Sequence, residues 1–306
     1  MKSNRVIQLL YASYHGGAEN YISSLVQGLS GCGREFILIY SREGPLVAKM
    51  RELGIPTLEM EMRGCLDLRA ARKLAFIART HDVQVVHTHF LRENCVAVLA
   101  RLFYPGLSVI TTCHLIPQNA LAVRVINRVL SFFLSKIIAV SLQVRQGLLA
   151  EGIGSRKVEV IYNGVDTDRF GKTDGLKMPG WLSKRPEERL LVTVGRLEEV
   201  KGHAFLLDVL HLLKNKNPDF KCVFIGAGGL EEALKSRARE LHLEENVVFA
   251  GYQREIHTIL PWFDIYVNAS SSEAHPFSVI EAMACRLPAV AARVGGVPEV
   301  VRDGIT

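Results

Sequence analysis

Two glutamates that lie eight residues apart, Glu273 and Glu281, belong to the segment with the clearest chemical potential. The first precedes a predicted helix and the second lies inside it, with Pro276 at the expected first helical position, where a missing N–H costs nothing. The amides of Phe277 and Ser278 are then unpaired at the positive end of the helix dipole, which binds phosphate oxygens well. Glu281 could accept hydrogen bonds from a ribose, and Glu273 could reach sugar hydroxyls. Taken alone, the segment fits a capped helix with two solvated carboxylates equally well.

A second segment carries two cations five residues apart. Arg196 and Lys201 follow a predicted strand that ends at Val194, and Gly195 allows a tight turn after that strand. Fixed Arg and Lys donors stabilise the charge that grows on a departing diphosphate where water is excluded. Surface charge on a loop between a strand and a helix is the ordinary alternative.

Two glycine-bearing loops also follow predicted strands. Gly16 and Gly17, in the run that begins at Tyr14, let the backbone approach a ligand closely at the start of a helix. A glycine-rich loop covers residues 226–229. Neither loop completes G-x-G-x-x-G, and no acidic residue follows at the appropriate strand end. A nicotinamide-dependent dehydrogenase is therefore weakly supported.

Histidines gather at two predicted strand ends, at His87, His89 and His114. No acidic partner with useful spacing accompanies them, so we expect no metal site. A histidine in such a place is commonly a hydrogen-bonded structural residue. His114 is the best functional candidate of the three, because it leads directly from a buried strand into a loop.

Alternating strands and helices must position these residues. Helices are expected at 18–29, 68–79 and 123–134, among others, and strands at 6–11, 36–40, 83–88, 108–112, 137–141, 158–161, 190–194, 221–225, 247–249, 265–267 and 289–292. The strands are continuous apolar runs, which indicates parallel sheets covered on both faces with right-handed crossovers. A Gly/Pro/charge-rich stretch at 171–189 reads as a linker.

The fold class we predict is α/β, with two doubly wound Rossmann-like domains that face each other across a cleft. The domains are expected at residues 1–185 and 186–306. In such sheets ligands bind outside the carboxyl ends of the strands, which is where every segment described above falls.

Composition bounds the class of protein. The 306 residues are 48% hydrophobic and 22% charged, with a net charge of +6 and a pI near 9.0. This is the balance of a globular protein whose basic surface suits phosphorylated ligands or an anionic membrane face. No Lys/Arg run interleaved with aromatics occurs, so nucleic-acid binding is not expected. None of the six cysteines lies in a C-x-x-C pair, which favours buried, reduced thiols.

Two segments bear on location. The N-terminal run has a basic start, a short apolar stretch and no cleavage site, so it reads as a buried strand, and we expect a cytoplasmic protein. Residues 121–140 carry Arg124, Asn127, Arg128 and Lys136, which a membrane-spanning helix rarely tolerates. We expect a core-packed amphipathic helix there that runs into a buried strand. Docking of this basic helix to anionic lipid, which would make the protein peripheral on the inner membrane face, is the alternative.

Several motifs occur in one order along the whole chain. They are Gly16-Gly17-Ala18-Glu19, Asn163-Gly164-Val165-Asp166, Gly195-Arg196-Leu197 with Lys201-Gly202, the pair Glu273 and Glu281, Gly295-Gly296-Val297-Pro298-Glu299, and Asp303-Gly304. Each is weak alone. Together they resemble glycosyltransferase family 4, retaining enzymes of the GT-B fold.

The resemblance implies that the second domain holds a UDP- or GDP-sugar donor and that the first supplies most of a glycan, lipid or small-molecule acceptor site. Arg196 and Lys201 would hold the diphosphate, Glu281 the ribose, and Glu273 would lie near the transferred sugar. Such enzymes serve glycan, polysaccharide or lipopolysaccharide biosynthesis. A nucleotide-sugar epimerase of GT-B shape and a degenerate, non-catalytic binding module are the alternatives.

Further expectations come from the same resemblance. Gly17 would lie beside the diphosphate and His114 near the reacting sugar. Transfer would proceed by front-face attack with retention, without a metal or other cofactor, because cations and a helix start take the metal's part. Arg286 occupies a position where the family commonly has glycine, which would strain a backbone of positive φ. The family's chain usually continues past Asp303-Gly304 with closing helices, so we expect the sequence to be a fragment.

Overall fold

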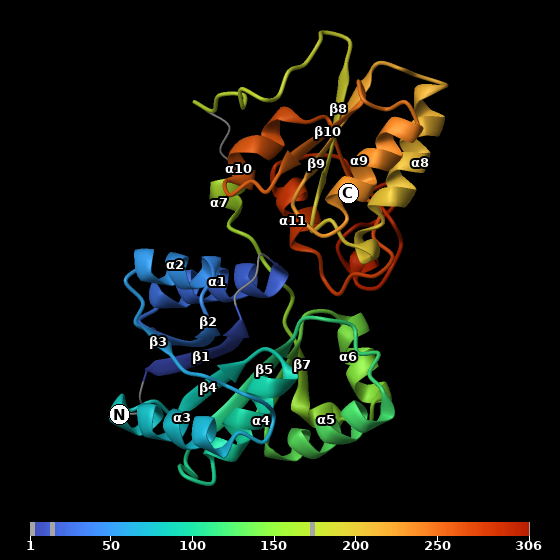
Figure 1. Ribbon diagram of the computed structural model, residues 1–306. Helices are drawn as coiled ribbons and strands as arrows, with labels where there is room; N and C mark the ends of the chain where they lie inside the picture. The colour runs from blue at the N-terminus through green and yellow to red at the C-terminus, as the bar shows by residue number, and fades with distance from the viewer. Residues whose placement is uncertain (1–3, 13–15, 172–174, 306) are drawn as a thin grey trace. The chain divides into compact units, whose positions relative to one another are not determined.

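The computed structural model describes residues 4–12, 16–171 and 175–305, and the chain divides into two compact units, Met1–Asn163 and Gly164–Thr306. Both units are α/β, with parallel strands and flanking helices (Figure 1). The predicted fold class of two Rossmann-like domains is confirmed.

In the described part of the first unit, seven parallel strands form one sheet in the order β3-β2-β1-β4-β5-β6-β7. Their bounds are β1 Arg5–Ala12, β2 Glu35–Arg42, β3 Thr57–Glu59, β4 Val85–Thr88, β5 Ser108–Cys113, β6 Lys136–Ala139 and β7 Val158–Val160. The central strands are buried along most of their length, as their continuous apolar runs predict. The expected strands are all present. The short edge strand β3 was not predicted, because three residues with partly exposed side chains give no apolar run.

Helices cover both faces of this sheet, with α1 and α2 on one side and α3, α4 and α5 on the other (Figure 1). The helices are α1 Gly17–Ser30, α2 Pro45–Glu52, α3 Leu68–Thr80, α4 Leu91–Ala100, α5 Leu121–Phe133 and α6 Leu142–Ala150, with a 3-10 turn at Ser155–Lys157. Asp67 caps α3 by accepting a hydrogen bond from the amide of Ala70, and Ser141 caps α6 through the amide of Val144.

Among the described residues of the second unit, five parallel strands form a sheet of order β10-β9-β8-β11-β12. The strands are β8 Arg189–Val194, β9 Phe220–Ile225, β10 Val247–Gly251, β11 Ile265–Asn268 and β12 Ala289–Ala291. The helices are α7 Thr167–Phe170, α8 His203–Lys214, α9 Glu231–Glu240, α10 Ile256–Ile259 and α11 Phe277–Ala284, with 3-10 turns at Glu199–Lys201, Leu260–Trp262 and Val297–Glu299.

Alternate residues of the central strands of this sheet enter two different cores. Val192 and Val223 pack into one cluster, and Leu191 and Phe224 pack into the other, on the opposite face. Because both faces are covered, the strand ends remain as the edge from which loops can present polar side chains.

The division between the units falls after Asn163, earlier than the expected boundary after residue 185. Phe170, Met178 and Leu182 pack into a core cluster of the second unit, which explains why the predicted linker, residues 171–189, falls within that unit.

Two expectations about burial are corrected. Within α5, which the structure describes completely, Ser131 is the one buried residue, so the expectation of an ordinary core-packed helix is wrong. Of the six free cysteines only Cys95 and Cys222 are buried, while Cys32 is exposed. Burial in a sheet raises the pKa of the Cys222 thiol, which keeps it protonated.

Among the helices that the structure describes, none combines the length and the hydrophobicity that crossing a membrane requires.

Candidate active site

The candidate site of the second unit is built from the loops that follow β8 and β11. The amide of Ser271 donates to the carbonyl of Val200 at 2.9 Å, which ties the two loops together directly. Gly202 has a φ of +66°, and a Cβ there would lie 2.0 Å from the carbonyl oxygen of Ala269. Only glycine fits this approach, and the turn that it permits fixes the neighbouring Lys201 over the loop after β11.

Lys201 and Glu273 form an ion pair, with Nζ 2.6 Å from Oε1. The same oxygen accepts hydrogen bonds from the hydroxyl of Ser270 at 2.7 Å and from the side-chain amide Nδ2 of Asn268 at 3.4 Å. The carbonyl of Glu273 accepts from the amide of Gly296 at 2.8 Å. With side-chain exposures of 21% for the lysine and 8% for the glutamate, this pair is shielded from water, which strengthens its electrostatic interaction.

Arg196 lies outside this network in the described structure. Its guanidinium donates to Glu198 at 2.8 Å and is half exposed, while its carbonyl meets the ring Nε2 of His203 at 3.2 Å. The structure therefore joins Lys201 to Glu273 and leaves the side chain of Arg196 on the surface of the same loop.

Helix α11 begins one residue later than the sequence suggested. Pro276 is the N-cap, with extended backbone, and Phe277 is the first helical residue, so the expectation of proline at the first helical position is wrong by one place. The first intrahelical acceptor is the carbonyl of Pro276, which receives the amide of Ile280 at 3.4 Å. The amides of Phe277 and Ser278 consequently have no acceptor within the helix, as expected for a helix start.

Glu281 occupies the next turn of α11, on the same face as Ser278 because the two are three residues apart. Burial raises the pKa of Glu281 to about 7, although the positive charge of Arg169 opposes this rise. A carboxyl group with such a pKa can donate as well as accept a hydrogen bond near neutral pH.

Tyr266 links β11 to the start of α11, and sequence reasoning missed it. Its hydroxyl donates to the hydroxyl of Ser278 at 2.8 Å, and its side chain is fully buried in β11. Burial raises the pKa of Tyr266, and the charges of Glu273 and Glu281 raise it further. The only signal in the sequence was a tyrosine inside an apolar strand.

The glycine-rich loop 226–229 packs directly against the backbone of the turn that carries Arg196. A Cβ on Gly226, whose φ is +149°, would lie 1.9 Å from the carbonyl oxygen of Gly195, and a Cβ on Gly228 would lie 2.5 Å from that of Leu197. Two backbone hydrogen bonds join the loops, from Leu197 to Ala227 and from Leu230 to Leu197, both of 3.1 Å. The glycines thus allow two loop backbones to pack closely. The incomplete G-x-G-x-x-G pattern of this loop did not suggest that role.

Two adjacent glycines allow a controlled test of this packing. Gly228→Ala is expected to lower the free energy of unfolding by about 2 kcal/mol or more, because the methyl group must displace the backbone of Leu197. Gly229→Ala should change it by less than about 1 kcal/mol, because a Cβ at Gly229 meets nothing within 4 Å. Urea denaturation of both variants measures the difference, and equal losses would contradict the assigned contact.

In the first unit, Gly16 is the N-cap of α1 with extended backbone, and Gly17 is its exposed first residue. A Cβ on Gly16 would meet only the carboxylate end of Glu19, at 3.2 Å. No neighbour in the described residues therefore requires glycine at position 16. Tyr14 and His15, the other residues of this motif, lie outside the described residues. The role of Gly16 and Gly17 beside a diphosphate stays a prediction.

The three histidines come together at the carboxyl ends of β4 and β5. His89 Nδ1 lies 3.0 Å from His114 Nε2, and its other nitrogen lies 2.9 Å from Oε1 of Gln8. His87 contacts the hydroxyl of Thr112 at 2.8 Å. Burial lowers the pKa of His114 to about 4 and, with help from the charge of His114, that of His87 to about 3.

These histidines are consequently neutral at physiological pH. Within the described residues no group of three or more His, Cys, Asp or Glu side chains is arranged to hold a metal ion. A neutral His114 can exchange hydrogen bonds with a hydroxyl group but carries no charge to a phosphate.

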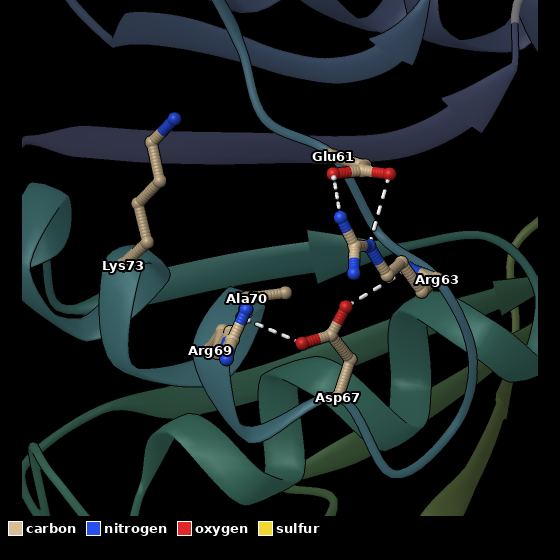
Figure 2. Close-up of a pocket in the computed structure, with 6 residues that line it drawn as sticks. All are labelled: Glu61, Arg63, Asp67, Arg69, Ala70 and Lys73. Atoms are coloured by element: carbon tan, nitrogen blue, oxygen red, sulfur yellow. Dashed lines mark hydrogen bonds and ion pairs between the residues drawn. The ribbon is translucent and has the colours of Figure 1, made fainter.

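A separate hollow in the first unit lies between the end of β3 and the start of α3 (Figure 2). Arg63 donates two hydrogen bonds of 3.1 Å to Glu61, and the Arg63 amide donates to Asp67, which also caps α3. Three of the charged residues that line this hollow thus bond one another, while Lys73 donates to the carbonyl of Glu59. None of the candidate residues contributes to the hollow.

Arg286 ends α11 in the left-handed conformation, with a φ of +61°. Its amide donates to the carbonyl of Met283 and that of Leu287 donates to Ala282, which is the pattern of a helix end that usually has glycine. The strain suspected at Arg286 is therefore present in the backbone.

Replacing Arg286 by glycine should relieve this strain. We expect Arg286→Gly to raise the free energy of unfolding by about 0.5–1 kcal/mol, since the exposed side chain contributes no packing that offsets a left-handed φ. Arg286→Ala, which keeps the Cβ, should gain nothing. A Gly variant less stable than the Ala variant in thermal unfolding would contradict this account.

Comparison with known families agrees with this arrangement. The family described as Glycosyltransferase Family 4 matches residues 15–169, which is about half of the chain, and the family described as Glycosyl transferases group 1 matches residues 180–306. The chain belongs to glycosyltransferase family 4. The two matches meet between residues 169 and 180, close to the division between the units.

Three individual proteins that this chain resembles share 19–24% sequence identity with it. The N-acetyl-alpha-D-glucosaminyl L-malate synthase of Bacillus anthracis is 24% identical over 247 residues, which is 78% of this chain and 64% of that protein. A glycosyltransferase from Rickettsia africae has a TM-score of 0.84 at 24% identity, covering 100% of this chain and 83% of that one. The Anabaena protein HepE, solved in complex with UDP and glucose, has a TM-score of 0.83 at 19% identity, covering 98% and 84%.

These similarities to solved structures establish the fold. The chain spans less than two thirds of the length of the first curated relatives that it matches, at 64% and 66%.

Proposed function

We propose that this family 4 protein is a retaining glycosyltransferase that moves a sugar from a nucleoside diphosphate, UDP or GDP, to a glycan, lipid or small-molecule acceptor. The observation that carries the proposal is the placement of the shielded pair of Lys201 and Glu273 directly before the start of α11, whose next turn carries Glu281. The cation of Lys201, the start of α11 and the carboxyl groups of Glu273 and Glu281 all follow the carboxyl ends of β8 and β11 in one sheet.

Each part of this edge has a role in the proposed reaction. The ammonium of Lys201 and the free amides of Phe277 and Ser278 neutralise the diphosphate, whose charge grows as the sugar departs. Arg196 joins them by exchanging Glu198 for a phosphate oxygen, since its present ion pair is exposed and therefore weak. The carboxyl of Glu281 bonds the ribose hydroxyls.

Binding of the donor also changes the partner of Glu273. When the diphosphate engages Lys201, the carboxylate of Glu273 loses part of its ion pair and becomes available to the hydroxyls of the sugar. Ser270 and Asn268 keep it in place through their hydrogen bonds. In this proposal Lys201 pairs with Glu273 before the donor binds and with the diphosphate afterwards.

The proposal includes a reaction without a metal or other cofactor. The positive charge that a divalent cation would supply to the diphosphate comes here from Lys201, Arg196 and the α11 amides. In the first unit, Gly17 would approach the diphosphate and the neutral His114 would bond a hydroxyl of the reacting sugar. The bound UDP and glucose of the HepE structure support a nucleotide-sugar donor.

Slow hydrolysis of the donor tests this function without knowledge of the acceptor. Incubated with α-linked UDP- and GDP-sugars, the protein should release the α-anomer of one sugar first, observable by proton NMR before mutarotation. Release of the β-anomer would exclude retention. An epimerised nucleotide sugar would favour the epimerase, and no turnover of any donor would favour a non-catalytic binding module.

A further inference from the structure

Helix α5 exposes its apolar side to solvent. Its six large apolar residues with high exposure, between 41% and 74%, are Leu121, Val125, Ile126, Val129, Phe132 and Phe133. They recur at spacings of three and four, so they form one continuous face. The buried residue on the opposite side is Ser131, whose hydroxyl donates to the carbonyl of Arg128 at 2.6 Å.

This orientation differs from that of a helix that packs its apolar stripe on a core. A surface helix normally buries its apolar stripe and exposes its charges. In α5 the side that carries Ser131 is mixed, because Arg124 and Asn127 are partly buried there together with Val123 and Leu130. The guanidinium of Arg124 donates to the carbonyl of Ala150, at the end of α6, at 3.0 Å. This mixed side is therefore held against the unit, and the exposed apolar face is available to a partner.

Cations surround this apolar face. Lys157 donates to the carbonyl of Leu134 at 2.7 Å, and Arg101 donates to that of Phe133, so both lie at the carboxyl end of α5. Arg128 is exposed beside the face and leans over Gly152. These contacts involve backbone carbonyls, so the positive charges are not cancelled by acidic side chains.

The surrounding sequence is equally one-sided. Residues 101–157 contain seven Lys and Arg and one acidic residue, Glu151; one of the seven, Lys136, pairs with Glu159 at 3.5 Å, just beyond this range. That glutamate is buried, and it accepts hydrogen bonds from the amide and side chain of Asn119, both of 3.1 Å. The surface around α5 is thus positive as well as apolar.

We propose that α5 docks onto an anionic membrane surface, lying parallel to it with the face from Leu121 to Phe133 inserted among the lipids. Apolar insertion combined with attraction to anionic headgroups is how interfacial helices bind. A second copy of the chain is a poorer occupant, because two such faces would bring their cationic rims together. The membrane would then hold the first unit beside acceptors that are anchored to lipid.

Vesicle sedimentation of the full chain tests this docking. The protein should sediment with vesicles of equal parts phosphatidylglycerol and phosphatidylcholine, bind pure phosphatidylcholine at least about tenfold more weakly, and dissociate from the mixed vesicles as salt rises. Val125→Glu with Phe132→Glu should weaken binding to the mixed vesicles by about tenfold or more. Phe205→Glu with Leu212→Glu, at similarly exposed positions of α8, is the matched control and should bind normally.

A variant that adds no charge separates loss of apolar insertion from electrostatic repulsion. Val125→Ser with Phe132→Ser adds no negative charge, and it must also bind weakly if insertion of apolar side chains contributes; it replaces the Glu variant should that protein unfold. Equal binding of parent and variants, no sedimentation of the parent, or a dimer in light scattering that the α5 substitutions dissociate would each overturn the proposal.

Discussion

Replacing Lys201 by alanine is expected to lower kcat/KM for the nucleotide sugar by about 100- to 1,000-fold, the effect of removing one fixed donor from a developing negative charge. The reason is geometric as well as electrostatic. Gly202 and the Ser271–Val200 hydrogen bond fix the loop, so the ammonium of Lys201 is already placed before the donor binds. Steady-state kinetics of donor hydrolysis measure the loss.

Loss of Lys201 also leaves the buried carboxylate of Glu273 without its counterion, so stability must be measured alongside activity. Lys201→Met combined with Glu273→Gln removes both charges, and it should recover most of the stability that the single substitution loses while activity stays low. Lys235→Ala breaks exposed ion pairs in α9 and serves as a control with near-normal kinetics. Full activity of Lys201→Ala would refute the assigned role.

Replacing Glu281 by glutamine is expected to weaken nucleoside diphosphate binding by about 10- to 100-fold, the range for a hydrogen bond made with a charged group. The same substitution should raise stability at pH 8. The folded state binds the Glu281 proton up to about pH 7, whereas the unfolded state releases it near the ordinary value of 4.5. The unfolding free energy of the parent therefore falls as pH rises between these two values, and glutamine removes this fall.

Thermal unfolding at pH 5 and pH 8 separates the two effects of this substitution. The advantage of Glu281→Gln over the parent should be small at pH 5 and larger at pH 8. Glu240→Gln, which alters an exposed glutamate of α9, should show no such pH dependence. A constant difference across the range would mean that Glu281 titrates normally in the folded protein.

Much of the fold could be predicted because parallel strands covered on both faces leave continuous apolar runs in the sequence. The residues at the ends of those runs, from Gly195 to Lys201 and from Ser270 to Glu281, were placed correctly at strand ends for the same reason. Strand β3 could not be predicted, because its three residues at a sheet edge are partly exposed and form no apolar run.

Partnerships between distant side chains could not be predicted in this way. Lys201 and Glu273 are remote in sequence, and each had been assigned to a different part of a ligand. Their ion pair depends on how two loops pack, and that is set by the backbone contact of Gly202 with Ala269. The link from Tyr266 to Ser278 was hidden for the same reason.

Helix α5 shows a different limit of prediction. Periodicity identified an amphipathic helix, but it does not say which side faces the core. The side held inward carries Ser131 and Arg124, whose guanidinium donates to the carbonyl of Ala150 at the end of α6. At Arg286, by contrast, a single residue type at the end of α11 was enough to anticipate a strained backbone, which the φ of +61° confirms.

Isothermal titration calorimetry of the protein with UDP, GDP and ADP tests most directly whether the edge formed by Lys201, Glu273 and the start of α11 holds a nucleoside diphosphate. The account predicts saturable binding of one nucleotide per chain with preference for UDP or GDP, and strong weakening in Lys201→Ala and Glu281→Gln. Absence of binding to all three nucleotides, or binding that both substitutions leave unchanged, would contradict it.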